Sequence, residues 1–265
     1  MIFNRRRNYG ANDFQIILIG YFLICIVFIS FLLSYFHTSF SIKSSLLSVP
    51  ACIAFLLLLF SSSAIAHTIN YDMREFSTTD VGLIYLKLGY LHILPLGMDH
   101  ILFVLSIFLI NTKLKPVIAQ MTVFTIAHSI TLGLGMYGVI KLPASVVEPI
   151  IALSIVFVAL ENIILDKVNT TRYIIIFAFG LIHGMGFAGV LLDLGLPPQD
   201  YVLGLISFNV GMELGQISVI LLAYFLLSKW FIHKPYYKRK IVIPISIVIA
   251  CIASFWVIER VFFIQ

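Results

Sequence analysis

The sequence predicts an all-α integral membrane protein, a polytopic helix bundle with six core spans plus one or two N-terminal spans. Two observations predict this fold class. First, 61% of the 265 residues are hydrophobic and only 11% are charged, whereas soluble domains carry roughly 25% charged residues. Second, the apolar residues form runs long enough to cross a bilayer as helices, which takes about 20 residues. These runs lie near 14–36, 46–66, 97–110, 116–138, 146–165, 172–192, 201–228 and 241–258.

Charge and cysteine content exclude several other classes of protein. The net charge is +5, but the basic residues stand in short loops between apolar runs and form no stripe suited to nucleic acid. Cys25, Cys52 and Cys251 lie far apart within apolar runs, so we expect buried thiols, neither a disulfide framework nor a thiolate metal site. No HExxH motif is present, which argues against the commonest metalloprotease design, and we expect no enzymatic activity.

The two N-terminal runs leave alternatives open. The run at 14–36 is predicted to span the membrane. The run at 46–66 either spans or acts as a signal sequence, because it ends in the A-x-A cleavage pattern Ala64-Ile65-Ala66. Cleavage there would make His67 the first residue of the mature protein.

The entry to the core bundle is predicted to be a broken or re-entrant helix. Residues 81–95 are apolar but are interrupted by Gly89 and Pro95, and Gly97 precedes the short run at 97–110. Irregular backbone of this kind is tolerated within a membrane only where it lines protein or a cavity.

Loop charges orient the second half of the chain, because cytoplasmic loops carry an excess of lysine and arginine. The loops assigned to the cytoplasm contain Lys113 and Lys115, then Lys167 and Arg172, then Lys229, Lys234, Lys238, Arg239 and Lys240. The intervening loops, with Lys141 and Glu148, then Asp193 and Asp200, are assigned to the outside. The basic residues at 5–7 also favour the cytoplasm. Two spans at 14–36 and 46–66 would return the chain to the cytoplasm, and one further crossing would then leave Lys113 outside. Either residues 81–95 therefore cross as a separate span, or one early segment does not span.

The first candidate metal ligands surround the predicted break in the entry helix. On a continuous helix, His92, Asp99 and His100 would fall at i, i+7 and i+8 on a single face. Because Pro95 and Gly97 interrupt the helix, we instead predict a loop that folds His92 back over Asp99 and His100. Imidazole and carboxylate are ligands of borderline transition metals. The alternative is an interfacial His92, with Asp99 orienting His100 through a hydrogen bond.

Two further histidines lie inside predicted spans. Burying such polar groups in hydrocarbon costs several kcal/mol each unless they face a partner, a cavity or an ion. His128 and His183 are therefore candidate metal ligands, although His128 could equally make a polar contact between helices. Gly180 and Gly184 flank His183 as a GxxxG pair, which indicates close helix packing.

The strongest interior polar face lies in the run at 201–228. Asn209, Glu213 and Gln216 are spaced i, i+4 and i+7 and so stack on one side of a helix. We expect Glu213 to be a metal ligand, with Asn209 and Gln216 as neutral oxygen donors. A second GxxxG pair, Gly211 and Gly215, lies on another side of the same helix.

The sequence gives weaker evidence of a functional role for the acidic residues near the ends of the run at 146–165. Glu161 and Asn162 are expected to be supporting polar residues, although a carboxylate near the cytoplasmic face can also remain hydrated. Glu148 is better explained as a helix-start carboxylate that the helix dipole favours.

Five sequence motifs occur in order along the chain. They are His92-Ile93-Leu94 with Gly97 and Asp99-His100-Ile101-Leu102-Phe103, Phe124-Thr125-Ile126-Ala127-His128-Ser129-Ile130-Thr131-Leu132, Val147-Glu148-Pro149-Ile150-Ile151-Ala152-Leu153-Ser154 with Glu161-Asn162, Gly180-Leu181-Ile182-His183-Gly184-Met185-Gly186-Phe187-Ala188, and Phe208-Asn209-Val210-Gly211-Met212-Glu213-Leu214-Gly215-Gln216. Together these motifs resemble the HupE/UreJ family of secondary nickel permeases and hydrogenase or urease accessory membrane proteins. The similarity covers roughly residues 81–230.

The resemblance implies a multi-pass protein of the bacterial inner membrane, often with a cleaved signal sequence. It divides the chain into N-terminal hydrophobic segments with an external loop (1–80) and a HupE/UreJ-like transmembrane domain (81–265). Matching also implies that His92, Asp99 and His100 form the family's nickel motif. The family's usual motif has five residues between the first histidine and Asp-His, whereas six intervene here, including Pro95, and the span at 14–36 lies outside the family pattern. The sequence therefore resembles a divergent branch.

Taken together, these features favour a secondary permease for Ni²⁺ or a similar divalent transition metal, with Co²⁺, Zn²⁺ or copper as other cargoes. His92, Asp99 and His100 would capture the ion, and His128, His183 and Glu213 would pass it inward. The alternatives are an intramembrane metal-dependent enzyme and a membrane accessory or assembly protein without transport. Expected partners are the lipid bilayer, the metal ion, and further copies of the chain or metalloenzyme-maturation proteins, with no nucleic acid.

Overall fold

The computed structural model describes residues 77–111, 113–193 and 198–262. The runs predicted at 14–36 and 46–66, with the cleavage pattern at 64–66, lie outside the described residues. The part that is described consists of helices and connecting turns, without strands. Five of its helices are long and apolar enough to cross a membrane, and a bent pair of shorter helices adds a sixth candidate span. The predicted all-α membrane bundle with six core spans is therefore confirmed.

The five long helices lie close to the predicted runs. They are α5 (Leu114–Met136), α6 (Ala144–Ile164), α7 (Thr171–Asp193), α8 (Tyr201–Ala223) and α10 (Ile243–Phe262). A π-helical segment, Tyr224–Ser228, and the short α9 (Lys229–Phe231) extend α8, and a second π-helical segment, Lys238–Val242, leads into α10. A short 3₁₀ turn, Pro198–Asp200, precedes α8.

The predicted break in the entry helix is confirmed. The first half, α3 (Thr78–Ile93), begins at Ser77, whose side-chain oxygen accepts a hydrogen bond from the backbone N–H of Asp80. The second half, α4 (Met98–Ile110), lies at 66° to the first. Pro95 between the halves has no N–H to donate to a helix. A side chain at Gly97 would collide with the backbone carbonyl of His92, so only glycine allows the chain to fold back this tightly.

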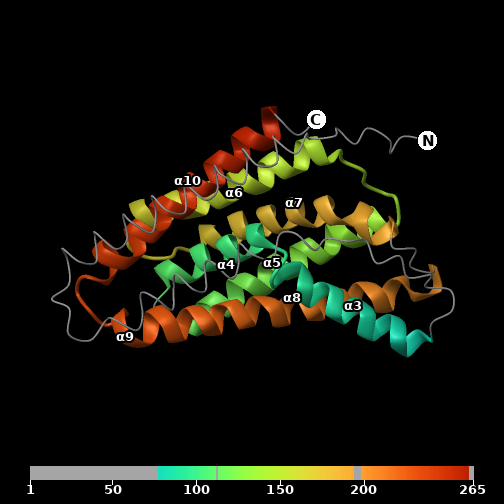
Figure 1. Cartoon of the computed structure of the whole chain (residues 1–265), viewed down its shortest axis with the longest axis horizontal. Coiled ribbons are helices and arrows are strands. Elements are labelled where there is room, and N and C mark those ends of the chain that lie inside the picture. Colours follow the sequence, from blue (N-terminus) through green and yellow to red (C-terminus); the bar gives the residue numbers. More distant parts are fainter. Residues whose placement is uncertain (1–76, 112, 194–197, 263–265) are drawn as a thin grey trace, which may run out of the picture. The chain divides into compact units, whose positions relative to one another are not determined.

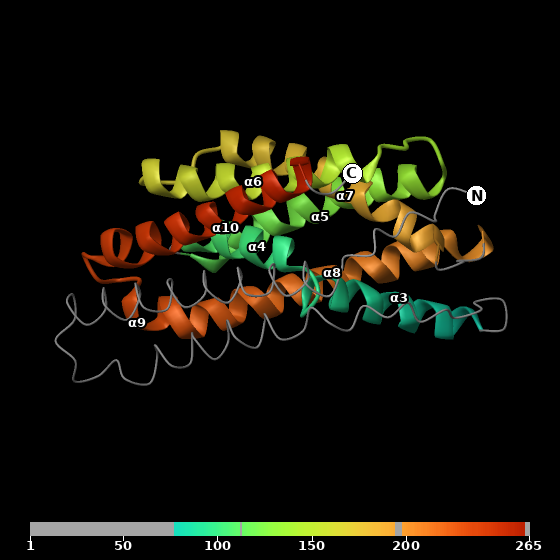
Figure 2. The same cartoon turned by 45° about the horizontal axis from the view of Figure 1, so that its top comes forward.

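The helices pack as three long pairs around α4. Helix α3 lies along α8, α5 along α7 and α6 along α10, and α4 contacts α5, α6, α8 and α10. In both views α4 lies between the α6–α10 pair and the α3–α8 pair (Figures 1 and 2). This central position explains why ten of the 13 residues of α4 are buried. The residues that follow the helix break are therefore carried into the middle of the bundle.

Glycines set the close approach within two of these pairs, as the GxxxG patterns predict. A Cβ at Gly184 of α7 would collide with the carbonyl of His128 on α5, and one at Gly211 of α8 would collide with the carbonyl of Leu86 on α3. Helices that approach this closely bring their other side chains together as well. The close packing predicted for the Gly180 and Gly184 pair is thereby confirmed, and Gly211 makes an equally close approach.

Two sequence-based assignments require correction. Cys251 was expected to be buried, but it is exposed on α10, beside α6. An exposed apolar-type side chain is tolerated there because the outer surface of a membrane bundle faces lipid. Arg172 was assigned to a cytoplasmic loop, but it lies in the first turn of α7 with its side chain fully buried. Its partners, described below, explain the burial.

Candidate metal site

Four histidines from four helices gather in the middle of the bundle. His92 ends α3, His100 lies in the first turn of α4, and His128 and His183 lie in the middle of α5 and α7. The candidate ligand atoms of His92, His100 and His128 all lie within 4.8 Å of one another. The ring of His183 is centred 5.3 Å from that of His100. We call these four residues the histidine cluster.

The helix break brings the first two histidines together. The rings of His92 and His100 are centred 4.6 Å apart and meet edge to face. The predicted folding of His92 back over the start of the next helix is therefore confirmed for His100. The ring of His128 lies 6.2 Å from His92 and 6.1 Å from His100, so α5 supplies the third side of the cluster.

Three of the four cluster histidines are buried, His92 is partly exposed, and the cluster's nitrogens have few protein partners. His128 has no exposed surface, His183 is 2% exposed and His100 is 7% exposed. His183 Nδ1 lies 2.8 Å from the backbone carbonyl of Phe179, so a proton on Nδ1 leaves Nε2 as a lone-pair donor. Among the described residues, no hydrogen-bond partner reaches that Nε2, Nε2 of His92, Nε2 of His100 or either nitrogen of His128.

Phenylalanines surround the histidine cluster. Phe187 of α7 lies 4.1 Å from the ring of His92, and Phe208 of α8 lies 5.4 Å from it. Phe124 of α5 lies 4.9 Å from His183, and Phe103 of α4 lies 5.3 Å from the same ring. An apolar shell of this kind restricts water around a polar site and controls its local dielectric. The sequence analysis did not identify these phenylalanines, which stand among many others in apolar runs.

Asp99 lies beside the cluster but is held by another partner. Its carboxylate forms an ion pair with Arg260 of α10, with nitrogen–oxygen distances of 2.9 and 3.1 Å. Arg260 also donates a hydrogen bond to the backbone carbonyl of Glu148 on α6. Asp99 nevertheless remains close enough to interact electrostatically with His92 and His183. Asp99 therefore lies at the edge of the histidine cluster and is paired with Arg260. The sequence analysis did not identify this arginine.

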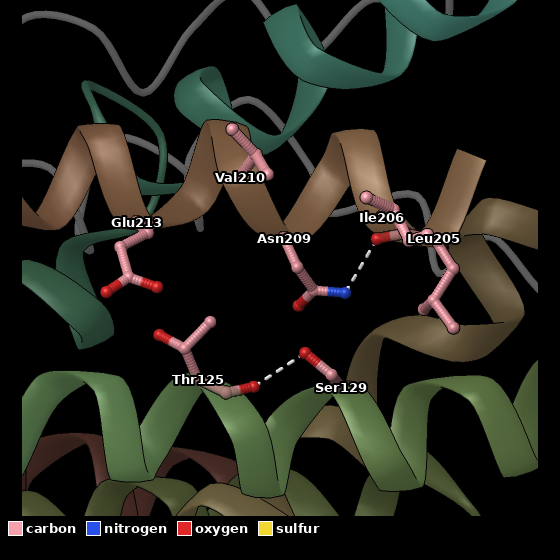
Figure 3. A pocket seen from close by; sticks show the side chains of 7 residues that line it. All are labelled: Thr125, Ser129, Leu205, Ile206, Asn209, Val210 and Glu213. Atoms are coloured by element: carbon pink, nitrogen blue, oxygen red, sulfur yellow. Dashed lines mark hydrogen bonds between the residues drawn. The ribbon is translucent and has the colours of Figure 1, made fainter. Parts of the chain in front are cut away.

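Glu213 and Asn209 of α8 line a pocket beside the cluster, and Gln216 continues the same face of the helix. The pocket has a volume of about 260 Å³ and lies between α5 and α8, where Asn209 and Glu213 point toward Thr125 and Ser129 (Figure 3). Glu213 accepts a hydrogen bond of 2.8 Å from the hydroxyl of Thr122. Gln216 accepts one of 3.1 Å from the hydroxyl of Thr125. These residues share one face, as their spacing predicts, and that face meets α5.

Glu161 and Asn162 lie in a separate polar network. The fully buried side chain of Arg172 lies 2.9 Å from Glu161 and donates a 3.1 Å hydrogen bond to the side-chain oxygen of Asn162. The amide nitrogen of Asn162 donates to the backbone carbonyl of Ser106 on α4, at 2.6 Å, and to the hydroxyl of Ser246 on α10, at 3.5 Å. The network thus joins four helices. A buried guanidinium requires partners that compensate the loss of its hydration, and this network supplies them for Arg172.

Residues 67–260, well over half of the chain, match a family model described as HupE / UreJ protein. No curated protein and no solved structure gives a significant match. The matched segment contains the helix break, the whole histidine cluster and the pocket between α5 and α8. Together with the helices that suit a membrane, this match shows a multi-pass membrane protein, and the chain belongs to the HupE / UreJ protein family.

Proposed function

We propose that this protein is a secondary permease for Ni²⁺ or a similar divalent transition metal in the bacterial inner membrane. The observation that carries the proposal is the convergence of His92, His100 and His128 from three helices, with ligand atoms within 4.8 Å of one another. The family is associated with nickel or cobalt transport or with accessory functions. That association supports a metal as the cargo and gives no support to catalysis.

The chemistry of the histidine cluster supports a borderline transition metal. Imidazole nitrogen is a ligand for nickel, cobalt, zinc and copper, whereas magnesium and calcium prefer oxygen. A buried polar group that lacks a partner costs about 1–3 kcal/mol. A divalent ion at the centre of the cluster would satisfy several ring nitrogens at once and recover that cost. Asp99, at the edge, would supply negative charge toward the ion.

The position of the cluster supports passage of the ion through the bundle. His92 and His100 stand on either side of the broken α3–α4 segment, and broken helices in membranes line pathways and cavities. Transport requires binding that is strong enough to admit the ion and weak enough to release it. Neutral histidines, with the Asp99 carboxylate already paired to Arg260, suit such moderate binding.

The test is uptake of radiolabelled Ni²⁺ into proteoliposomes that contain the purified full chain. We expect His100→Ala and His128→Ala to reduce the initial rate at least tenfold. His233→Ala is the matched control, because His233 is an exposed histidine outside the spanning helices, and its rate should equal that of the unchanged protein. Rates for the two cluster variants equal to that of the control would refute the proposal.

The same preparation separates the alternatives. An intramembrane enzyme that retains its metal would bind Ni²⁺ at a fixed stoichiometry without accumulating it inside the vesicles. Three histidines with an open position are also a known catalytic arrangement, which makes this comparison necessary. An assembly protein whose histidines serve only helix packing would show neither saturable binding nor uptake.

A further inference from the structure

We infer that the pocket between α5 and α8 is a second cation site, separate from the histidine cluster, which binds a monovalent alkali-metal ion. Four of the residues that line it carry side-chain oxygens, Thr125 and Ser129 on α5 and Asn209 and Glu213 on α8 (Figure 3). The histidine cluster, by contrast, consists of ring nitrogens. Oxygen ligands favour hard cations, so the two sites suit different ions.

The hydrogen-bond donors of the pocket are already engaged by other residues. The hydroxyl of Ser129 donates to the backbone carbonyl of Thr125 at 2.6 Å, and the hydroxyl of Thr125 donates to Gln216. The side-chain N–H of Asn209 donates to the backbone carbonyl of Leu205 at 2.7 Å. The two hydroxyl oxygens therefore keep acceptor lone pairs while their protons point elsewhere, and the Asn209 amide keeps its oxygen. The remaining lining is apolar, from Leu205, Ile206 and Val210, so a cation in the pocket would find its ligands among these oxygens and the Glu213 carboxylate.

Asn209 supplies an independent observation. The residue is 8% exposed, and its side-chain oxygen has no hydrogen-bond partner among the described residues. In Figure 3 this oxygen points into the space between α8 and α5. Because an unsatisfied buried carbonyl costs free energy, native proteins rarely keep one without a ligand or a water. The oxygen of Asn209 is thus available to an ion in the pocket.

The charge and the size of the pocket indicate the class of ion. Glu213 is the single carboxylate among its lining residues, so one positive charge balances the site. Uncompensated charge is costly within a membrane, and this requirement favours a monovalent ion over a divalent one. A volume of about 260 Å³ exceeds that of one ion and leaves room for several of its waters.

The pocket is adjacent to the histidine cluster, which gives the second ion a role. Thr125 and Ser129 lie on α5 within one helical turn of His128, which belongs to the histidine cluster. An ion bound to these two residues therefore lies next to the part of α5 that carries a cluster histidine. We infer that this ion is the coupling ion of the permease; this role, unlike the site itself, rests on the proposed function.

The first experiment is independent of nickel. Binding of radiolabelled Na⁺ to the purified full chain is measured without any transition metal, in the unchanged protein and in Glu213→Gln and Asn209→Ala. We expect saturable binding that weakens at least tenfold in both variants and persists in Glu259→Gln. Glu259 is the matched control, because it is a carboxylate on α10 that does not line the pocket. Absence of saturable Na⁺ binding, or equal binding in Glu213→Gln, would overturn the site.

The second experiment tests the coupling role. Radiolabelled Ni²⁺ uptake into proteoliposomes is measured with an inward Na⁺ gradient, with a pH gradient and with neither. We expect the Na⁺ gradient to raise the initial rate several-fold in the unchanged protein and to have no effect in Glu213→Gln. Stimulation by the pH gradient alone would overturn the assignment to an alkali-metal ion. Glu213-dependent Na⁺ binding in a protein that moves no Ni²⁺ would refute the permease while leaving the oxygen site intact.

Discussion

Arg260 and Asp99 form an ion pair, with nitrogen–oxygen distances of 2.9 and 3.1 Å, although 161 residues separate them in the sequence. The pair joins α4 to α10 at the edge of the histidine cluster. Arg260 therefore competes with any bound cation for the carboxylate of Asp99. A metal that uses this carboxylate must share it with the guanidinium or displace it, and the guanidinium can regain it fully when the metal leaves.

We expect Arg260→Gln to bind Ni²⁺ more tightly than the unchanged protein, because it frees the Asp99 carboxylate and removes a positive charge from the edge of the site. The expected decrease in Kd is about tenfold, equivalent to about 1.4 kcal/mol. Titration calorimetry on the purified protein measures it. Lys229→Gln, which removes a positive charge from α9 at the end of the bundle, is the control and should leave the Kd unchanged. A weaker affinity in Arg260→Gln would show that Arg260 holds the site together instead.

The break between α3 and α4 could be predicted from the sequence because it depends on local backbone chemistry. Proline lacks an N–H and glycine permits close approach, and both are visible as residue types. The same holds for the GxxxG pairs, where the absence of a side chain at Gly184 and Gly211 itself sets the helix distance. Spans were predictable because about 20 apolar residues are required to cross a bilayer.

The partners of the charged residues could not be predicted, because they depend on which helices become neighbours. No residue near Asp99 in the sequence indicates that Arg260 lies beside it. Arg172 has the sequence context of an ordinary loop charge, and its burial depends on the packing of α7 against α6, which carries Glu161. The pairing of α3 with α8 is likewise a property of the whole bundle. For the same reason, spacing along α8 identified the polar face of Glu213 but not the pocket that it forms with α5.

We expect Gly184→Ala to reduce both stability and Ni²⁺ binding. Its added Cβ would collide with the carbonyl of His128 and with the hydroxyl of Thr131, so α7 must move away from α5. Overpacking of this kind costs about 1–3 kcal/mol, and the movement would separate His183 from the other cluster histidines. Thermal unfolding in detergent and calorimetric Ni²⁺ titration measure the two effects.

Gly189→Ala is the control for that substitution. It lies on the same helix, but its Cβ would meet no heavy atom within 4 Å. Because alanine is a better helix former than glycine by about 1 kcal/mol, this variant should be as stable as the unchanged protein or slightly more stable. Equal losses in both variants would show that the close contact between α7 and α5 at Gly184 does not set the result, because helix propensity alone favours alanine at both positions.

Asp166, in the loop between α6 and α7, forms a 2.7 Å ion pair with Lys238, the first residue of the π-helical segment that leads into α10. The hydrogen bond and the positive charge of Lys238 lower the pKa of the Asp166 carboxyl below its ordinary value. A carboxyl whose pKa is lowered on folding stabilises the folded state above its unfolded pKa, which is about 3.9, and loses that contribution as the pH falls through the folded value. We therefore expect a small decrease in Tm for Asp166→Asn at pH 7, and a difference from the unchanged protein that shrinks as the pH falls below about 3.9 and through the lowered folded-state pKa. A Tm difference that persisted at low pH would show that the pair acts through something other than charge.

The network around Arg172 should govern stability rather than metal binding. Removing one partner of a buried ion pair leaves an uncompensated charge and costs about 3–5 kcal/mol. Glu161→Gln should therefore unfold well below the temperature of the unchanged protein, because it leaves the fully buried guanidinium of Arg172 without its carboxylate. The Kd for Ni²⁺ of the protein that remains folded should be unchanged, since Glu161 contacts Arg172 and not the histidine cluster.

Asp166→Asn is the comparison that isolates burial in this measurement. It removes the carboxylate of the other acidic–basic pair near the same helix ends, but the Asp166 side chain is 88% exposed, whereas that of Glu161 is 11% exposed. Exposed ion pairs contribute little to stability, so its Tm at pH 7 should decrease far less. If Glu161→Gln instead kept its Tm and lost Ni²⁺ binding, Glu161 would belong to the path of the metal, as a ligand or a relay. The prediction that the network around Arg172 governs stability and not metal binding would then be wrong.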